Sequence, residues 1–65
     1  MKIALNMLDV NVIFTNFETE VKAELEVNPN LTFDNYRDEV EELSGYEVTL
    51  SDELRPFFDE IKAAF

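Results

Sequence analysis

Carboxylates make up most of the side chains in this chain that could carry chemistry. Fifteen of the 65 residues are Asp or Glu, five are Lys or Arg, and the formal net charge is -10. The chain has no His and no Cys, so it lacks a Ser–His or Cys–His nucleophile pair and any imidazole or thiolate metal ligand. Two uses of carboxylates remain: as a paired general acid and base, or as negatively charged binding groups.

Binding explains these carboxylates better than catalysis does. So many acids in so short a chain form close pairs by chance, and a small domain has difficulty enclosing a dry pocket. The run Asp34–Glu39 lacks the central glycine of a calcium-binding loop and falls within a predicted helix. We therefore expect no enzyme activity, no cofactor and no metal site.

A single domain, residues 1–65, must position the acids. A chain of about 60 residues buries only about 60% of its unfolded surface, so without disulfides its stability needs a well-packed core or dimerisation. Six Phe and two Tyr can supply such a core. The N-terminal apolar stretch is broken by Asn6 and is too short for a secretory signal or a membrane span. We expect a cytoplasmic protein.

The segment Phe17–Val27 has the most regular pattern. Apolar or small residues alternate with Glu or Lys throughout it, which predicts a strand with one dry face and one wet face. Residues 8–14 also alternate, and Thr15-Asn16 would join the two segments as an antiparallel hairpin, although a tight turn prefers glycine. The alternation changes phase at Met7-Leu8, so either a bulge lies there or a separate short element begins the chain.

The second half of the chain predicts a helix from about Phe33 to Ser44. Thr32 is the expected N-cap, and Gly45, the only glycine, stands where a C′ residue belongs. Alternation over Tyr46–Leu50 then predicts a short third strand.

Apolar residues at helical spacing predict a C-terminal helix. Pro56 either follows a single turn at Ser51–Leu54 and begins this helix, or kinks a longer one. The expected fold is therefore a small α+β domain: an N-terminal antiparallel hairpin, a helix, a short third strand and a C-terminal helix. Its core should combine residues of the long strand and both helices: Val21, Leu25, Tyr36, Val40 and Phe58.

On this predicted fold the carboxylates fall into three groups. The wet face of the long strand carries Glu18, Glu20, Glu24 and Glu26, the polar face of the first helix carries Asp34, Asp38, Glu41 and Glu42, and the C-terminal segment carries Asp52, Glu53, Asp59 and Glu60. Alternate strand positions lie about 6.6 Å apart, of similar order to the phosphate spacing of DNA, about 3.4 Å of axis per strand. Any one row alone is also explained as a solvated surface that blunts edge aggregation.

The basic residues form no patch. Lys2, Lys22, Arg37, Arg55 and Lys62 are scattered among acids, so we expect no direct binding to nucleic acid or to an anionic membrane. Ile13 would fall on a wet face, where it is either incidental or a small apolar contact for a partner or a second copy.

In size, acidity and lack of catalytic side chains, the whole chain resembles the small inhibitors that bacteriophages encode against host DNA-handling enzymes. These include anti-CRISPR proteins, uracil-DNA glycosylase inhibitors and other DNA mimics. The resemblance is one of composition and aligns no motif. It implies a protein-binding inhibitor that acts in the host cytoplasm.

We therefore predict an inhibitor whose strand and helix carboxylates imitate phosphates and block a basic nucleic-acid-binding protein. The alternative is a structural or assembly module, a homodimer, whose acids serve only solubility. Partner affinity that falls steeply with salt favours the first, and salt-insensitive self-association favours the second.

Overall fold

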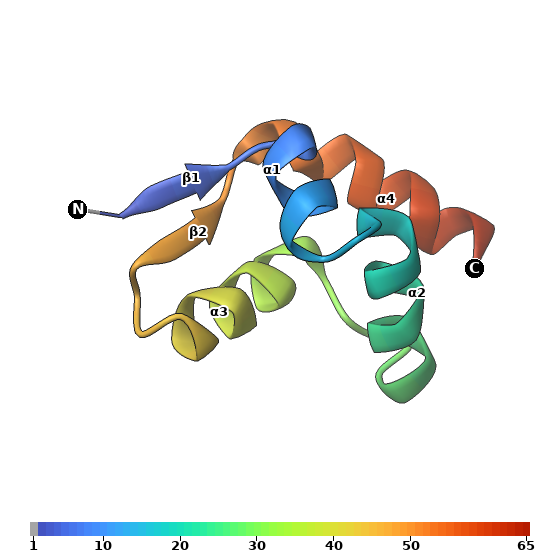
Figure 1. Ribbon diagram of the computed structural model, residues 1–65. Coiled ribbons are helices and arrows are strands. Elements are labelled where there is room, and N and C mark those ends of the chain that lie inside the picture. The colour runs from blue at the N-terminus through green and yellow to red at the C-terminus, as the bar shows by residue number, and fades with distance from the viewer. Residues whose placement is uncertain (1) are drawn as a thin grey trace.

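Four short helices and a two-stranded sheet form from residues 2–65, the part of the chain that the computed structural model describes (Figure 1). The strands are β1 (Ile3–Leu5) and β2 (Val48–Leu50). The helices are α1 (Met7–Ile13), α2 (Phe17–Val27), α3 (Phe33–Leu43) and α4 (Arg55–Ala64), with a 3-10 turn, η1 (Asp52–Leu54), directly before α4. The α+β class is confirmed in this broad sense.

The sheet is parallel, so the predicted antiparallel hairpin is wrong. β1 pairs with β2 in one register, which runs from Ile3 opposite Val48 to Leu5 opposite Leu50. Parallel strands need a long crossover, which the first three helices supply here (Figure 1). Of the alternatives for the N-terminus, the separate short element is the one observed, since β1 ends before α1 begins.

The most regular segment of the sequence is the helix α2 rather than a strand. Phe17, Val21 and Leu25 are buried, whereas Thr19, which belongs to the same alternation, is exposed. Residues four apart share a face of a helix as well as of a strand, so the buried set fits both periods. Glu, Lys and Ala favour helix, and the Asn16 side chain caps it by accepting the Thr19 N–H at 3.0 Å.

Residues 8–14 are also mostly helical, which removes the other half of the predicted hairpin. The Asn6 side chain accepts the N–H groups of Leu8 and Asp9, and the Asp9 carboxylate accepts the Asn6 N–H at 3.3 Å. This reciprocal capping box starts α1. A single residue of α1, Val10, is fully buried, so the helix packs through a narrow contact.

From Thr32 onwards the structure follows the prediction closely. Thr32 caps α3 by accepting the Asn35 N–H at 3.2 Å, and Gly45 has the left-handed φ of 68° expected after a helix end. The strand predicted over Tyr46–Leu50 is present as β2, which is shorter than expected. One turn, η1, does precede α4, and Pro56 lies in the first turn of α4, where no N–H is needed.

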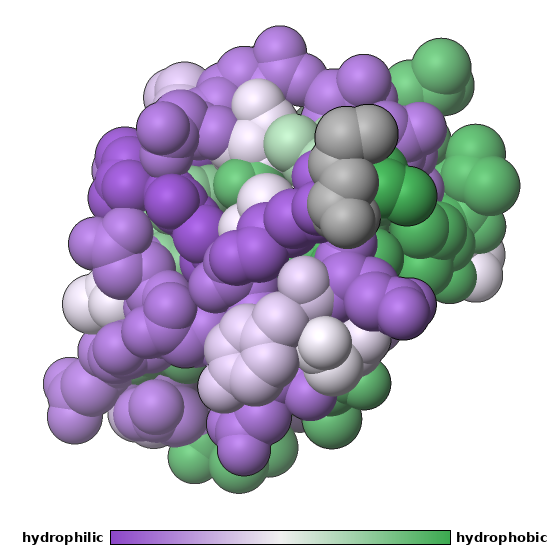
Figure 2. All heavy atoms as spheres, turned by 90° about the vertical axis from the view of Figure 1, so that its left-hand side faces the viewer, coloured by the Kyte–Doolittle hydropathy of each residue, from purple (hydrophilic) through white to green (hydrophobic). Residues whose placement is uncertain are grey.

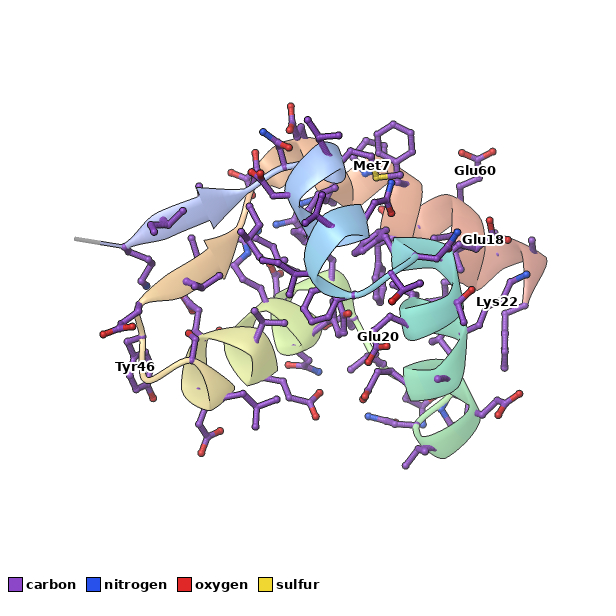
Figure 3. The ribbon with its side chains drawn as sticks, in the orientation of Figure 1. Met7, Glu18, Glu20, Lys22, Tyr46 and Glu60 are labelled. Atoms are coloured by element: carbon purple, nitrogen blue, oxygen red, sulfur yellow. The ribbon has the colours of Figure 1, made fainter. Side chains whose placement is uncertain are left out.

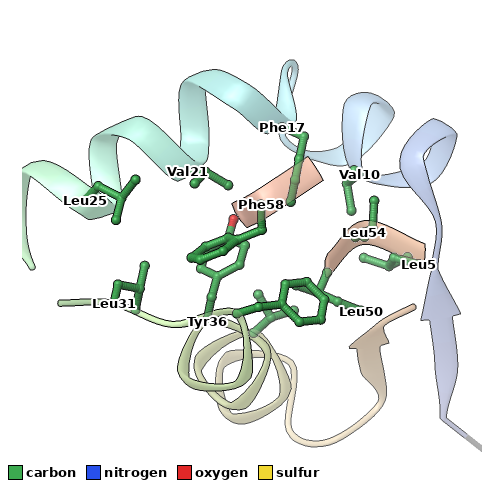
Figure 4. Close-up of a cluster of buried hydrophobic side chains, with 12 residues drawn as sticks. Leu5, Val10, Phe17, Val21, Leu25, Leu31, Tyr36, Leu50, Leu54 and Phe58 are labelled. Atoms are coloured by element: carbon green, nitrogen blue, oxygen red, sulfur yellow. The ribbon is translucent and has the colours of Figure 1, made fainter. Parts of the chain in front are cut away.

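One apolar core joins all these elements (Figure 4). Its buried members are Leu5, Val10, Phe17, Val21, Leu25, Leu31, Phe33, Tyr36, Val40, Leu50, Leu54 and Phe58. The predicted meeting of Val21 and Leu25 with residues of α3 and α4 is therefore confirmed, although both belong to a helix. Phe58 is central, since its ring lies 5.8 Å from those of both Tyr36 and Phe33, measured between centroids.

Within residues 2–65, none of the helices has the length and apolar character that a bilayer crossing requires.

Candidate protein-binding surface

The predicted row of four carboxylates on a strand does not exist, because these residues lie on α2. Residues four apart share a helix face and residues two apart do not, so Glu20 and Glu24 lie on one flank and Glu18 on another. Figure 3 shows Glu20 reaching from α2 toward α3, whereas Glu18 and Lys22 lie on the opposite side. Lys22 binds Glu18 at 2.9 Å across one turn. Glu26 is exposed beyond this pair.

The structure also divides the predicted group on α3. Asp34 binds Arg55 at 2.9 Å, and Glu41 binds Lys2. Hydrogen bonds from Arg55 and Lys2 lower the pKa of Asp34 and of Glu41, respectively. Asp38 and Glu42 are exposed, and neither belongs to an ion pair within residues 2–65. Only part of the group is therefore free to meet a partner.

An ion-pair network ties Asp34 to the predicted third group through Asp52. Arg37 binds Asp52 at 2.6 Å, and the guanidinium groups of Arg37 and Arg55 both lie 4.9 Å from the centroid of the Phe33 ring. The two arginines thus cover a buried aromatic ring while they neutralise two aspartates. These carboxylates serve the fold, and we remove them from the candidate surface.

Three other carboxylates gather where α2 faces α3. Glu20 and Glu24 come from α2 and Glu39 from α3, and we call them the acidic cluster. Burial raises the pKa of Glu24, the negative charges of Glu39 and Glu20 raise it further, and a hydrogen bond with Glu39 also favours the protonated form. No ion pair among residues 2–65 includes a member of the cluster.

The hydroxyl of Tyr36 is buried close to this cluster. Tyr36 is only 3% exposed, and its hydroxyl has no hydrogen-bond partner within the described residues. Burial raises its pKa, and the charges of Glu20, Glu24 and Glu39 raise it further. The cluster therefore borders a poorly solvated part of the protein, where charges interact more strongly than in water.

Sequence reasoning missed Glu39, which was not assigned to any group. Its place is set by the packing of α2 and α3 around α4, and the strand prediction for α2 excluded that arrangement. One signal was present: Glu39 lies three residues after Tyr36 and directly before Val40, so it borders the buried stripe of α3.

An apolar groove of about 220 Å³ opens where α1, α3 and the sheet meet. Its walls are mainly apolar: Leu5, Ile13, Phe14, Val40, Leu43 and Val48. Leu43 is 82% exposed and Ile13 is 58% exposed, so two large side chains of the groove remain in water. Leu43 lies one helical turn from Glu39, which places the groove next to the acidic cluster on α3.

Figure 2 looks onto the side of the molecule where the strands lie. Hydrophilic residues cover most of this face, and hydrophobic residues gather along its right-hand edge. A second hollow of about 280 Å³ lies between α1, α2 and α4, and Met7, Glu18 and Glu60 contribute to its walls (Figure 3). Glu18 is already bound by Lys22, so this hollow has fewer free charges than the acidic cluster.

The surface of residues 2–65 shows no set of three acidic side chains placed to hold a metal ion. No protein-family model, curated protein or solved structure matches the chain. The geometry of the acidic cluster and of the neighbouring groove is therefore what supports a function.

Proposed function

We propose that the chain is an acidic protein-binding inhibitor that occupies the nucleic-acid site of a basic protein. The acidic cluster of Glu20, Glu24 and Glu39 carries the proposal, because it holds like charges together on two helices and none of the three belongs to an ion pair among residues 2–65. Asp38 and Glu42 extend the charge along α3. Glu18, Asp34 and Glu41 form ion pairs with cations, so the proposal no longer includes them among the carboxylates that imitate phosphates. Glu26 lies outside the acidic cluster and is not included either.

The distribution of cations supports this assignment. Lys2, Lys22, Arg37 and Arg55 all bind carboxylates away from the acidic cluster. Like charges held close together oppose folding, so the cluster reduces stability. A basic partner would replace this repulsion with attraction, and the complementary fields would also speed the encounter.

Spacing supports imitation of phosphates by helical carboxylates. Glu20 and Glu24 are one turn apart, a rise of about 6 Å, and Asp38 and Glu42 repeat the interval on α3. Two phosphate steps along a DNA strand span about 6.8 Å of axis. A nucleic-acid site on the partner protein that binds alternate phosphates through Lys and Arg would accept carboxylates at this interval.

A competition assay tests the proposal. Proteins are captured from a cell lysate on the immobilised chain at low salt and eluted with high salt. Each is then tested for binding to a fluorescent DNA duplex or RNA strand. We expect the chain to displace the nucleic acid, to bind none itself, and to lose at least tenfold in potency between low and physiological salt.

A triple variant and a matched control locate the contact. Glu20→Gln/Glu24→Gln/Glu39→Gln should displace nucleic acid at least tenfold less well than wild type. Glu53→Gln/Asp59→Asn/Glu60→Gln removes the same charge from the η1–α4 segment and should retain most of the activity. Equal potency of the two folded variants would remove the acidic cluster from the interface.

The assembly-module alternative also has an observation in its favour. Both strands have a side without a further strand among the described residues, and the groove leaves apolar side chains in water. A homodimer would cover these features, and its acids would then serve only solubility. Sedimentation analysis in low and high salt distinguishes this alternative, because it predicts self-association that salt does not weaken.

A further inference from the structure

We propose that the partner contacts this chain through a basic amphipathic helix. One large apolar side chain of that helix lies in the groove beside Leu43, and a Lys or Arg one turn away binds the acidic cluster. This inference rests on the proposed function and specifies the chemistry of the partner.

The groove is suited to a single side chain. Its volume of about 220 Å³ is below the roughly 300–1,000 Å³ of pockets that bind drug-sized molecules. Its lining has almost no polar group that could orient a small ligand. The exposed faces of Leu43 and Ile13 would lose water against an apolar anchor, which is the main favourable term in such contacts.

Charge identifies the occupant of the groove as a basic protein rather than a second copy of the chain. Among the described residues, neither Lys nor Arg contributes to the groove walls. Glu39 lies one helical turn from the groove residue Leu43, so at least one carboxylate of the acidic cluster shares the helix face of the groove edge. A second copy would bring its own net charge of -10 and the same carboxylates to this edge, whereas a basic element would neutralise them.

The spacing of the two features indicates a helix. Glu39 and Leu43 are four residues apart on α3, so the α3 member of the acidic cluster and the edge of the groove are separated by about 6 Å along the helix axis. On a partner helix, residues at i and i+4 or i and i+3 have the same separation on one face. An apolar anchor followed by a cation at that interval would reach both features together.

Three synthetic helical peptides of equal length test the proposal by fluorescence anisotropy. The first has a Leu stripe flanked by Lys, the second replaces the Leu stripe with Gln, and the third replaces Lys with Glu. We expect the first to bind at least tenfold more tightly than the second, and the third not to bind. Leu43→Ser should reduce affinity for the first peptide about tenfold and leave affinity for the second unchanged.

Val27→Ser is the matched control. Val27 is 85% exposed, lies at the end of α2 outside the groove, and should keep wild-type affinity for all three peptides. Because Leu43 and Val27 are both largely in water, neither change should unfold the protein. Methyl chemical shifts of Leu5 and Val48 should also move with the first peptide and stay in place with the second.

Each contrary outcome has a distinct meaning. If Leu43→Ser binds the Leu-stripe peptide like wild type, or the Gln-stripe peptide binds equally well, the groove is not the anchor site. The proposed function would still stand if Glu20→Gln/Glu24→Gln/Glu39→Gln lost salt-sensitive binding, and would fall if it did not. A dimer of the free chain that Leu43→Ser dissociates would assign the groove to a second copy and overturn the inference.

Discussion

Glu24→Gln should stabilise the protein, because it removes one charge from the acidic cluster. Repulsion between Glu20 and Glu24 within α2 costs about 0.2–0.5 kcal/mol. Repulsion between Glu24 and Glu39, which lie on different helices and are partly exposed, costs about 0.2–1 kcal/mol. The free energy of unfolding should therefore rise by about 1 kcal/mol near pH 7. For a domain of this size such a gain raises Tm by about 4–8 °C.

The gain should depend on pH in a defined direction. The pKa of Glu24 is raised in the folded protein, so between the ordinary glutamate pKa and the raised one the native state holds more protons than the unfolded state. The contribution of Glu24 to the stability of the wild-type protein is therefore fully present at low pH, and it is lost as the pH rises through the pKa that Glu24 has in the folded state. The difference between Glu24→Gln and wild type should be small near pH 4 and largest near pH 7.

Thermal melts followed by circular dichroism between about pH 4 and pH 7 provide the measurement. Glu26→Gln changes the net charge equally outside the acidic cluster and should give the smaller gain. Glu24→Gln/Glu39→Gln should gain less than the sum of its single variants, since both changes relieve one shared repulsion. If Glu24→Gln gained no more than Glu26→Gln, or gained equally at both ends of the pH range, the carboxylates of the cluster would not repel one another in solution.

Three further changes test the core, the helix start and the overall charge. Tyr36→Phe should stabilise the protein by about 1 kcal/mol in urea denaturation, because it removes a buried hydroxyl that has no hydrogen-bond partner within residues 2–65. A loss of similar size would show that water or a side chain binds the hydroxyl in solution. Leu25→Ala should cost about 2–5 kcal/mol in the same assay, and a cost under 1 kcal/mol would contradict its burial. Thr32→Ala should cost about 1 kcal/mol through loss of the N-cap of α3, and an unchanged midpoint would argue against that cap. Moderate sodium chloride at pH 7 should raise Tm by screening repulsion, whereas a steady fall would show that the ion pairs around Phe33 dominate.

The sequence predicted the second half of the fold well because its signals were local. Thr32, Gly45 and Pro56 each restrict the backbone at their own position, so the ends of α3 and the start of α4 could be located directly. For α2, the four-residue spacing of Phe17, Val21 and Leu25 fits one face of a strand as well as one face of a helix. The preference of Glu, Lys and Ala for helices was the signal that distinguishes the two. The parallel pairing of β1 with β2 joins the beginning of the chain to its second half and has no local signal.

The candidate site was predicted only in part for the same reason. Glu20 and Glu24 were predicted to lie on the wet face of a strand, whereas they lie on the helix α2. Asp34 and Glu41 were predicted to bind a partner, but they form ion pairs with Arg55 and Lys2, which come from distant parts of the sequence. The role of Glu39 depends on how α2 and α3 pack around α4, which composition and spacing along the chain do not determine.

The pairing of β1 with β2 has a consequence for the order in which the molecule opens and closes. β1 contributes one buried side chain, Leu5, and its pairing with β2 closes a long loop of chain between Ile3 and Val48. The entropy cost of closing this loop is therefore set against a small gain from packing. We expect β1 to form last during folding and to open first in native-state hydrogen exchange. The Ile3 N–H, which donates to Glu47, and the Ser51 N–H, which donates to Leu5, should exchange much faster than the amides of α2 and α4. Because Leu5 is also a wall of the groove, a bound partner should slow exchange at these two amides more than elsewhere.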